Sequence, residues 1–320
     1  MDAREIWESG EIGACAARTA LTPLSWLYAG GWSVYRALYD LGIKRAFEPA
    51  IPTICIGNLT VGGMGKTPVT RYVAESLDRP YVLGLSGYGA PQSEGATLAP
   101  DGPLDPAEWG DEPAMFREWL PNAPMVVGRR RPLAAQIVAE RFPDHILLMD
   151  DGMQHLPLRK HVSILLDPEK PKNGRTLPAG PYREPRWERR RADLILPGEF
   201  KIVEAPLAFD HPGGDYALLC ALGNPQGFVD AVSRLLRRPP TADRRLPDHD
   251  PLTAGTLFDG LPPDLPIVTT EKDWVKLRQR LDIGERDVRV AVRKVRIEPE
   301  AEFRGWLAER LDGVQTKSHP

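Results

Sequence analysis

The sequence predicts an α/β fold: a P-loop NTPase-like core with a parallel sheet, followed by a second, smaller α/β domain. Short apolar runs typical of strands alternate with segments typical of helices, which is the pattern of a parallel sheet covered by helices. A glycine-rich run at 57–67 lies between one such strand and one such helix, the position that a P-loop occupies. A proline- and glycine-rich stretch at 206–214 interrupts the alternation, which then restarts.

We therefore expect three parts: an N-terminal helical segment over 1–48, a P-loop core over 49–205 and a smaller domain over 206–320. In the core, short apolar runs predict strands at 52–56, 81–85, 125–127, 145–149, 162–166 and 194–196. Helices are expected there at 67–77, 112–119 and 132–141. In the smaller domain we expect strands at 216–222, 267–269 and 288–292, with helices at 226–236 and 274–280.

The N-terminal segment is expected to face a membrane, with a break in its helix at Gly30-Gly31. Its longest uncharged part, 20–35, is shorter than the ~20 apolar residues that a spanning helix needs. Early acidic residues also argue against a signal peptide. Aromatic rings followed by cations suit the bilayer interface; the residues concerned are Trp26, Tyr28, Trp32, Tyr35, Arg36, Lys44 and Arg45. The alternative is a helix that packs on the core of the protein itself.

Composition narrows the classes of partner. The 320 residues are 42% hydrophobic and 27% charged, as in a globular protein, and the net charge of −3 gives no indication of nucleic-acid binding. Nothing in the sequence indicates a protein partner. Three widely spaced cysteines predict neither a zinc site nor a disulfide framework, and fit a reducing compartment. Arginine clusters at 129–131, 183–191 and 234–245 are either solvated faces or surfaces for phosphates and anionic head groups.

The glycine-rich run is the strongest functional signal. Its glycines allow successive backbone N–H groups to surround a phosphate, and the following helix N-terminus adds partial positive charge. Lys66 is placed to reach the β- and γ-phosphates of ATP, and the Thr67 hydroxyl to bind Mg²⁺. One position departs from the strict motif, because Thr60 replaces its first glycine. The expected nucleotide-binding residues are Thr60, Val61, Gly62, Gly63, Met64, Gly65, Lys66 and Thr67.

Acidic residues at two further places suggest the rest of a phosphotransfer site. Asp150 and Asp151 follow the apolar run 145–149, as in a Walker B element that holds Mg²⁺. Asp111 is a candidate acceptor for the proton of an attacking hydroxyl, although it could instead cap a helix. His249 lies between two aspartates, which would orient its ring, unless it is a simple surface-loop histidine.

Several motifs together resemble one family, the tetraacyldisaccharide 4′-kinases of lipid A biosynthesis. The resemblance runs in family order over about residues 20–280, and two of its motifs, Asp-Asp-Gly-x-Gln-His and Leu-Pro-Ala-Gly-Pro, are quite specific. The family also tends to lack glycine at the position of Thr60. The matching stretches are 23–28, 57–63, 65–68, 110–113, 150–155, 177–181, 183–185, 248–249, 270–273 and 275–276.

The resemblance implies an ATP- and Mg²⁺-dependent kinase that phosphorylates the 4′-hydroxyl of a tetraacyl glucosamine disaccharide 1-phosphate and gives lipid IVA. It implies a smaller C-terminal domain joined by a hinge, and an N-terminal helix on the cytoplasmic face of the inner membrane. The implied catalytic residues are Asp111, His249 and Lys66, with Asp111 and His249 as an acid–base pair. Those near Mg²⁺ are Thr67, Asp150 and Asp151, and those near the substrate are Glu112, Gln154, His155 and Arg183.

Two stretches depart from the family pattern by losing an arginine, Ser86-Gly87-Tyr88-Gly89 and Leu222-Gly223-Asn224-Pro225. Other P-loop classes provide the alternatives. A GTPase or metallochaperone would need a guanine motif, and Thr270-Glu271-Lys272-Asp273 has its residues in the wrong order. A membrane-associated switch ATPase would carry a lysine where this chain has Val61. A membrane adaptor with an inactive P-loop is disfavoured by the intact Lys66, Thr67 and Asp150.

Overall fold

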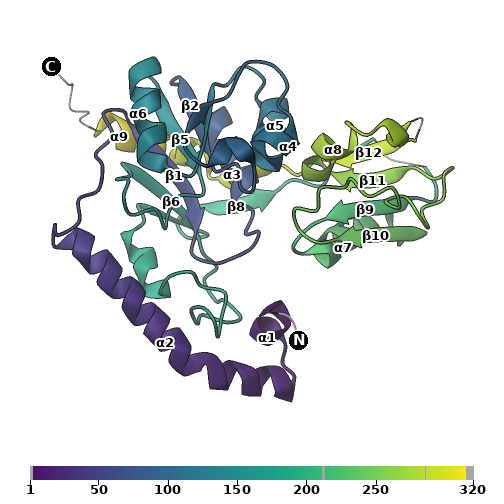
Figure 1. Cartoon of the computed structure of the whole chain (residues 1–320), viewed down its shortest axis with the longest axis horizontal. Coiled ribbons are helices and arrows are strands. Elements are labelled where there is room, and N and C mark those ends of the chain that lie inside the picture. The colour runs from purple at the N-terminus through teal and green to yellow at the C-terminus, as the bar shows by residue number, and fades with distance from the viewer. Residues whose placement is uncertain (1–2, 211–212, 285, 315–320) are drawn as a thin grey trace. The chain divides into compact units, whose positions relative to one another are not determined.

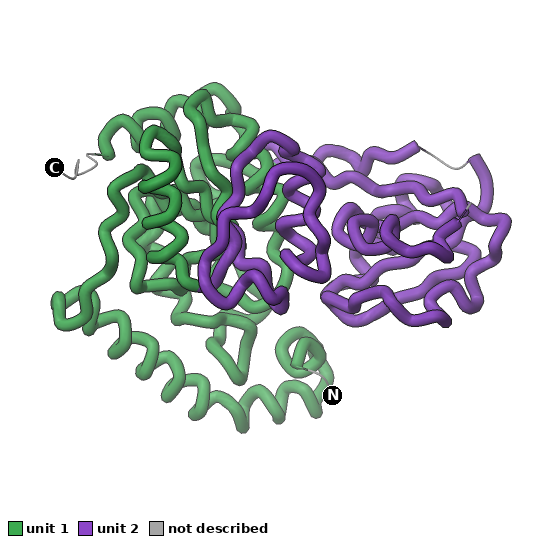
Figure 2. Tube along the Cα trace, turned by 45° about the horizontal axis from the view of Figure 1, so that its top comes forward, with its two compact units in different colours: residues 1–84, 130–202, 297–320 green, residues 85–129, 203–296 purple. Residues whose placement is uncertain are grey.

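A computed structural model describes residues 3–210, 213–284 and 286–314 and has the predicted α/β architecture. The chain divides into two compact units that interleave along the sequence (Figure 2). Unit 1 comprises residues 1–84, 130–202 and 297–320, and unit 2 comprises residues 85–129 and 203–296. Each unit therefore collects segments that are distant in the sequence.

The sheet of unit 1 runs in the order β2-β5-β1-β6-β7, and all its pairings are parallel. The apolar runs that predicted these strands are buried because helices cover a parallel sheet. The register places Ile56 of β1 opposite Asp150 of β5, so the P-loop and the Asp150-Asp151 pair leave the sheet at the same edge. The strands are β1 (Thr53–Asn58), β2 (Tyr81–Leu85), β5 (Ile146–Asp150), β6 (Val162–Leu166) and β7 (Leu194–Leu196).

Four helices complete unit 1 besides the N-terminal α1 (Ala3–Glu8). They are α2 (Ile12–Asp40), α3 (Lys66–Ser76), α6 (Arg131–Arg141) and α9 (Glu300–Asp312), and a 3₁₀ turn covers Arg186–Arg191. Helix α3 packs on β1 and β5, directly behind the glycine-rich loop (Figure 1). The predicted helices at 67–77 and 132–141 are thus confirmed to within a residue.

The expected break at Gly30-Gly31 is wrong, because α2 is one continuous helix of 29 residues that also passes through Pro23 (Figure 1). Tertiary contacts override the poor helix propensity of these residues. Ser25 is buried and its hydroxyl donates to the carbonyl of Thr176 at 2.6 Å. Further along, hydrogen bonds from Tyr28, Trp32 and Arg36 hold the helix against Arg183 and Glu184.

One side of α2 is exposed and apolar. Trp26 and Leu27 are 72% and 73% exposed, whereas the Trp32 indole donates to Glu184 Oε2 at 3.1 Å. The other side of the helix packs on the protein, as one of the two alternatives expected, and the membrane-facing role of the exposed side stays a prediction. Among the described residues, no helix has the length and apolar character needed to cross a bilayer.

Unit 2 is built on a four-stranded parallel sheet in the order β10-β9-β11-β12. Its strands are β9 (Ala217–Ala221), β10 (Ala242–Leu246), β11 (Ile267–Thr270) and β12 (Val288–Ala291), and its helices are α7 (Pro225–Leu236), α8 (Glu271–Leu277) and a 3₁₀ turn at Leu281–Ile283. Buried side chains from the two faces of β9 form two apolar clusters, around Leu218 and Leu219. Residues 216–291 therefore form an α/β sheet region of unit 2 with its own apolar core.

The segment 85–129 supplies the remaining elements of unit 2. These are a 3₁₀ turn at Pro91–Ser93, β3 (Thr97–Leu98), α4 (Pro106–Trp109), α5 (Asp111–Trp119) and β4 (Met125–Val127), with β3 and β4 antiparallel. Helix α5 packs on α8, which brings residues from the middle and last thirds of the chain together. Strands β8 (Lys201–Glu204) and β13 (Val295–Glu298) form a separate two-stranded sheet, and a unit boundary falls within each.

This division differs from the contiguous boundaries expected at 49–205 and 206–320. Residues 85–129 group with the second unit, and the C-terminal helix α9 belongs to unit 1. The reason for the second difference is aromatic packing: the fully buried Phe303 ring lies 6.0 Å from Tyr72 and 5.6 Å from Phe200. A helix that contributes a buried ring to a core is part of that core.

Replacing Phe303 with alanine should therefore destabilise unit 1. A buried Phe→Ala change typically costs about 3–5 kcal/mol, because it removes apolar contacts and leaves a cavity. Urea unfolding monitored by circular dichroism should show the loss, and the exposed Glu302→Ala on the same helix is the control. An unchanged unfolding midpoint in Phe303→Ala would contradict the assignment of α9 to the core of unit 1.

Candidate active site

The glycine-rich loop of unit 1 ends in an open helix N-terminus. Helix α3 begins at Lys66, and its N-cap residue Gly65 has a left-handed backbone with φ of 75°. Gly62 also has positive φ, at 92°, a conformation that glycine adopts without strain. No described side chain caps α3. Its first N–H groups and its dipole are thus available to an anion such as a phosphate.

A second segment holds the start of this loop. The amide of Val61 donates to the carbonyl of Pro181 at 2.8 Å, and the amide of Arg183 donates to the carbonyl of Leu59 at 2.7 Å. Between them Thr60 pairs with Tyr182, which is fully buried. Gly180 makes the turn possible, since a Cβ there would lie 2.3 Å from the carbonyl oxygen of Arg175. The Leu-Pro-Ala-Gly-Pro stretch is therefore the structural support of the P-loop.

Lys66 lies in a compact charged cluster. Its Nζ atom is 3.2 Å from Asn58 Oδ1 and 3.5 Å from Asp151 Oδ2. Arg183 binds the same two residues, with Nη2 at 2.6 Å from Asn58 Oδ1 and 3.2 Å from Asp151 Oδ1. Burial raises the pKa of Asp151, but Lys66 and Arg183 outweigh it and hold that pKa below its ordinary value. The cluster thus keeps an ionised carboxylate and two cations beside the P-loop.

The neighbouring Asp150 is buried at the end of β5. Its side chain accepts a hydrogen bond from the Thr70 hydroxyl of α3 at 3.0 Å, and its carbonyl accepts one from Arg131. Among the described residues, no three His, Cys, Asp or Glu side chains form a complete metal site. Carboxylates at the end of β5 and a hydroxyl from Thr67 are nevertheless oxygen donors of the kind that Mg²⁺ prefers alongside nucleotide phosphates.

The loop after β5 brings Gln154 into the same cluster. Its Nε2 atom donates to the carbonyl of Asn58 at 2.9 Å and to Glu184 Oε1 at 2.7 Å. Next to it, burial together with the charges of Lys160 and Arg131 lowers the pKa of His155 to about 4, so this imidazole is neutral at pH 7. Gln154, His155 and Arg183 were expected to contact substrate; in the structure Gln154 and Arg183 join β1 to the segment that supports the P-loop.

The second cluster lies within unit 2. Asp111 is the first residue of α5, and its side chain does not cap the helix, whose N-cap is Gly110. Asp111 Oδ2 lies 3.4 Å from His249 Nδ1 and 3.2 Å from Lys276 Nζ. Burial raises the pKa of Asp111, but the hydrogen bonds and charges of His249 and Lys276 outweigh it and lower that pKa. Glu112, the other expected residue here, follows in the first turn of α5 and is half-buried.

Further contacts surround His249. Its ring centroid is 5.7 Å from that of Tyr88, and the Arg129 guanidinium lies 5.5 Å from the Tyr88 ring. The sequence pattern gave no role to Tyr88, Asn58 or Lys276. Lysine is rarely buried, so a buried lysine such as Lys276 points to a function. The spacing of residues in the sequence does not show which lysine is buried.

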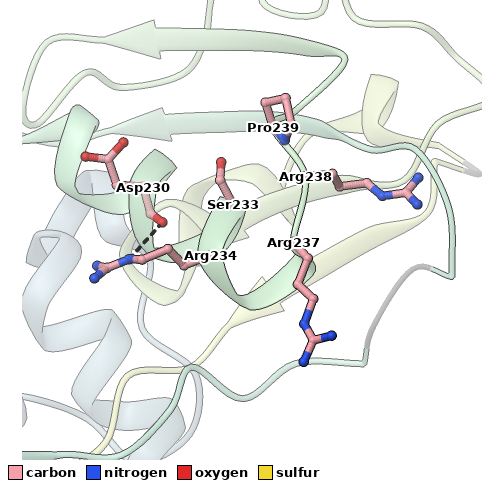
Figure 3. Close-up of a pocket in the computed structure, with 6 residues that line it drawn as sticks. All are labelled: Asp230, Ser233, Arg234, Arg237, Arg238 and Pro239. Carbon is pink, nitrogen blue, oxygen red and sulfur yellow. Dashed lines mark hydrogen bonds between the residues drawn. The ribbon is translucent and has the colours of Figure 1, made fainter.

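A pocket of about 650 Å³ lies elsewhere in unit 2, at the end of α7 (Figure 3). Arg234 there donates to the backbone carbonyl of Asp230, and Arg238 pairs with Asp215. None of the expected site residues lines this pocket, so we do not assign it to the reaction. Its lining residues are Asp230, Ser233, Arg234, Arg237, Arg238 and Pro239.

Comparisons with known proteins identify the family of this chain. A family model described as tetraacyldisaccharide-1-P 4′-kinase, LpxK, matches residues 17–312. The tetraacyldisaccharide 4′-kinases of Shewanella baltica (strain OS185) and Shewanella piezotolerans are 35% and 33% identical over 300 residues, covering 86% of this chain and 86% and 87% of theirs.

A crystal structure of LpxK from Aquifex aeolicus in complex with ATP superposes with a TM-score of 0.78 and 27% identity, covering 92% of this chain and 99% of that one. The family resemblance carried by the P-loop, Asp-Asp-Gly-x-Gln-His and Leu-Pro-Ala-Gly-Pro motifs is thereby confirmed. This chain belongs to the tetraacyldisaccharide-1-P 4′-kinase family.

Proposed function

We propose that the chain is an ATP-dependent tetraacyldisaccharide 4′-kinase of lipid A biosynthesis, which phosphorylates the 4′-hydroxyl of a tetraacyl glucosamine disaccharide 1-phosphate to give lipid IVA. The observation that carries the proposal is the uncapped start of α3 with Lys66 held beside Asp151. Curated relatives with the same name and a related structure that holds ATP support it. The stretch Thr270-Glu271-Lys272-Asp273 does not favour the rival GTPase, since Thr270 is the N-cap of α8 and Asp273 accepts hydrogen bonds from Thr270 and Ala221.

The residues of unit 1 would bind the nucleotide. The loop from Thr60 to Thr67 would wrap the phosphates with backbone N–H groups, and Lys66 would exchange its contact with Asp151 for the β- and γ-phosphates. Thr67, Asp150 and Asp151 would hold Mg²⁺, which would neutralise part of the negative charge of the phosphates. Positive charge that meets the developing negative charge of the transferred group lowers the barrier.

Asp111 and His249 would activate the acceptor. In the proposed step the 4′-hydroxyl oxygen forms a bond to the γ-phosphorus, and the bond from that phosphorus to the β–γ bridging oxygen breaks, releasing ADP. The hydroxyl proton passes to Asp111, which is ionised because His249 and Lys276 lower its pKa. His249 holds the carboxylate in orientation through its Nδ1 atom.

We also place the chain at the cytoplasmic face of the inner membrane, as a peripheral or monotopic protein. The lipid acceptor requires access to a bilayer, and α2 presents exposed apolar side chains, Trp26 and Leu27 among them. Burying such side chains in the interface stabilises attachment without a spanning helix.

Lys66→Ala should reduce kcat by about 100-fold or more, as expected when a preorganised charge is removed from a transition state. The assay is phosphate transfer from labelled ATP to the lipid disaccharide, with circular dichroism to confirm folding. The exposed Lys170→Ala of the same unit serves as control. Unchanged turnover in folded Lys66→Ala would exclude the P-loop assignment.

Asp111→Asn and His249→Ala should each slow transfer by about 10²- to 10⁴-fold, the usual contribution of a positioned general base. If the two residues act as a unit, the double variant should be little slower than the poorer single variant. ATP affinity should stay the same, and the exposed Asp264→Asn should leave all parameters unchanged. Multiplicative losses would show independent roles, and a large loss of ATP affinity in Asp111→Asn would move that residue to the nucleotide site.

Changing Trp26 and Leu27 together to glutamate should release the protein from vesicles that contain anionic phospholipid, because charged side chains cannot enter the apolar interface. Sedimentation with the vesicles measures the bound fraction. Trp32 is left intact because it bonds Glu184, and the fully exposed Leu281→Glu in unit 2 is the control. Retention of the double variant on vesicles would place the attachment elsewhere in the chain.

A further inference from the structure

Lys276 is a buried cation whose partners come from three different segments. Its side chain is 7% exposed, and Nζ lies 2.7 Å from the carbonyl oxygen of Asp250 and 3.2 Å from Asp111 Oδ2. Asp273 Oδ1 is 3.8 Å away on the same helix. A buried ammonium group is tolerated only when it is paired and hydrogen-bonded, so these contacts fix where the group lies.

The sequence of α8 determines this position. The Thr270 hydroxyl accepts from the amide of Asp273, and Asp273 Oδ2 accepts from Thr270 Oγ1 at 2.7 Å and from the amide of Ala221 at 3.0 Å. These bonds fasten the first turn of α8 to the end of β9. Lys276 lies one turn further along the same face of the helix, because residues three apart are neighbours there.

The same helix holds the loop that carries His249. Lys272 Nζ lies 2.7 Å from Asp248 Oδ1 and 3.4 Å from His249 Nε2, on one side of the histidine. Lys276 binds the carbonyl of Asp250 on the other side. His249 itself has a left-handed backbone with φ of 63°, which is uncommon for a residue other than glycine and persists where neighbouring contacts support it.

Of these two lysines, Lys276 is the one that also makes a direct contact with Asp111. One ammonium group therefore joins the start of α5 to the loop at 248–250. Removing it would take from the Asp111 carboxylate and the Asp250 carbonyl the one donor that they share.

We infer that Lys276 is a positioning residue for phosphate transfer: it holds the Asp111 carboxylate beside His249 by binding Asp111 and the His249 loop at once. This inference rests on the proposed function, in which Asp111 and His249 activate the acceptor. Lys276 acts through Asp111 and does not touch the reacting atoms in this account.

The electrostatics are consistent with this role. Facing Asp111 are His249 from the loop and Lys276 and Lys272 from α8, with Asp248 and Asp273 next to those lysines. Burial raises the pKa of Asp111, and His249 and Lys276 are the main groups that lower it. Without Lys276 the pKa of Asp111 should rise. Activity needs the ionised form, so on acidification the variant should lose activity at a higher pH than the unchanged protein does.

Three substitutions of Lys276 and one control substitution test the inference. Lys276→Met and Lys276→Gln remove the charge with similar volume, Lys276→Arg retains it, and Lys294→Met removes an exposed lysine from the same unit as control. We expect Met and Gln to lower kcat by about 10- to 100-fold, part of the contribution typical of a positioned base. The acid limb of the kcat profile should move to higher pH, Arg should restore part of both losses, and the KM for ATP should not change.

A double variant separates positioning from general damage. Since Lys276 acts through Asp111, Asp111→Asn with Lys276→Met should be no slower than Asp111→Asn alone. Thermal melting identifies which variants are folded. If Lys276→Met is unfolded, Lys276→Gln is used in its place. One result would overturn this inference and leave the proposed function standing: folded Lys276→Gln has a normal kcat and an unmoved acid limb, while Asp111→Asn is slow. Full activity of Asp111→Asn would instead overturn the proposed role of the pair.

Discussion

The shared use of Asn58 and Asp151 by two cations is the interaction on which the proposed nucleotide site depends. Lys66 and Arg183 both bind these residues, at the ends of the adjacent strands β1 and β5. Two cations so close repel each other, and an ionised carboxylate with an amide oxygen offsets that repulsion. Arg183 also extends the segment that pairs with the start of the P-loop. Loop shape and lysine position are therefore set by one cluster.

The same physical device recurs in unit 2, where Asp111 is shared by His249 and Lys276. In each cluster a partly buried carboxylate stays ionised because the cations beside it outweigh the cost of burial. The two carboxylates differ in the groups that they contact. Asp151 faces cations that phosphates would also attract, whereas Asp111 faces a histidine that can orient a proton acceptor.

The sequence predicted most of the strands and the P-loop because both are local signals. A buried parallel strand is a continuous apolar run, and a P-loop is a glycine-rich turn between strand and helix. It failed where distant contacts decide the outcome. Helix α2 continues through Gly30-Gly31 because its inner side is bonded to residues 176–184. Strand β10 was missed because Ala-Asp-Arg-Arg-Leu is a polar edge strand. The Asp111–His249 pair came from family resemblance, and the third member, Lys276, required coordinates.

Helix α2 has one side that is bonded to the protein and one side that is exposed. Its inner side bonds Glu184 through Trp32 and Arg36, and Glu184 in turn accepts from Gln154, which donates to the carbonyl of Asn58. The exposed rings on the outer side therefore cannot turn inward without breaking this chain of hydrogen bonds. A helix that only packed on the core would gain stability by hiding Trp26, since burying a large apolar side chain is favourable by about 1.5–3 kcal/mol. Its exposure is consistent with a lipid interface as the environment of that side.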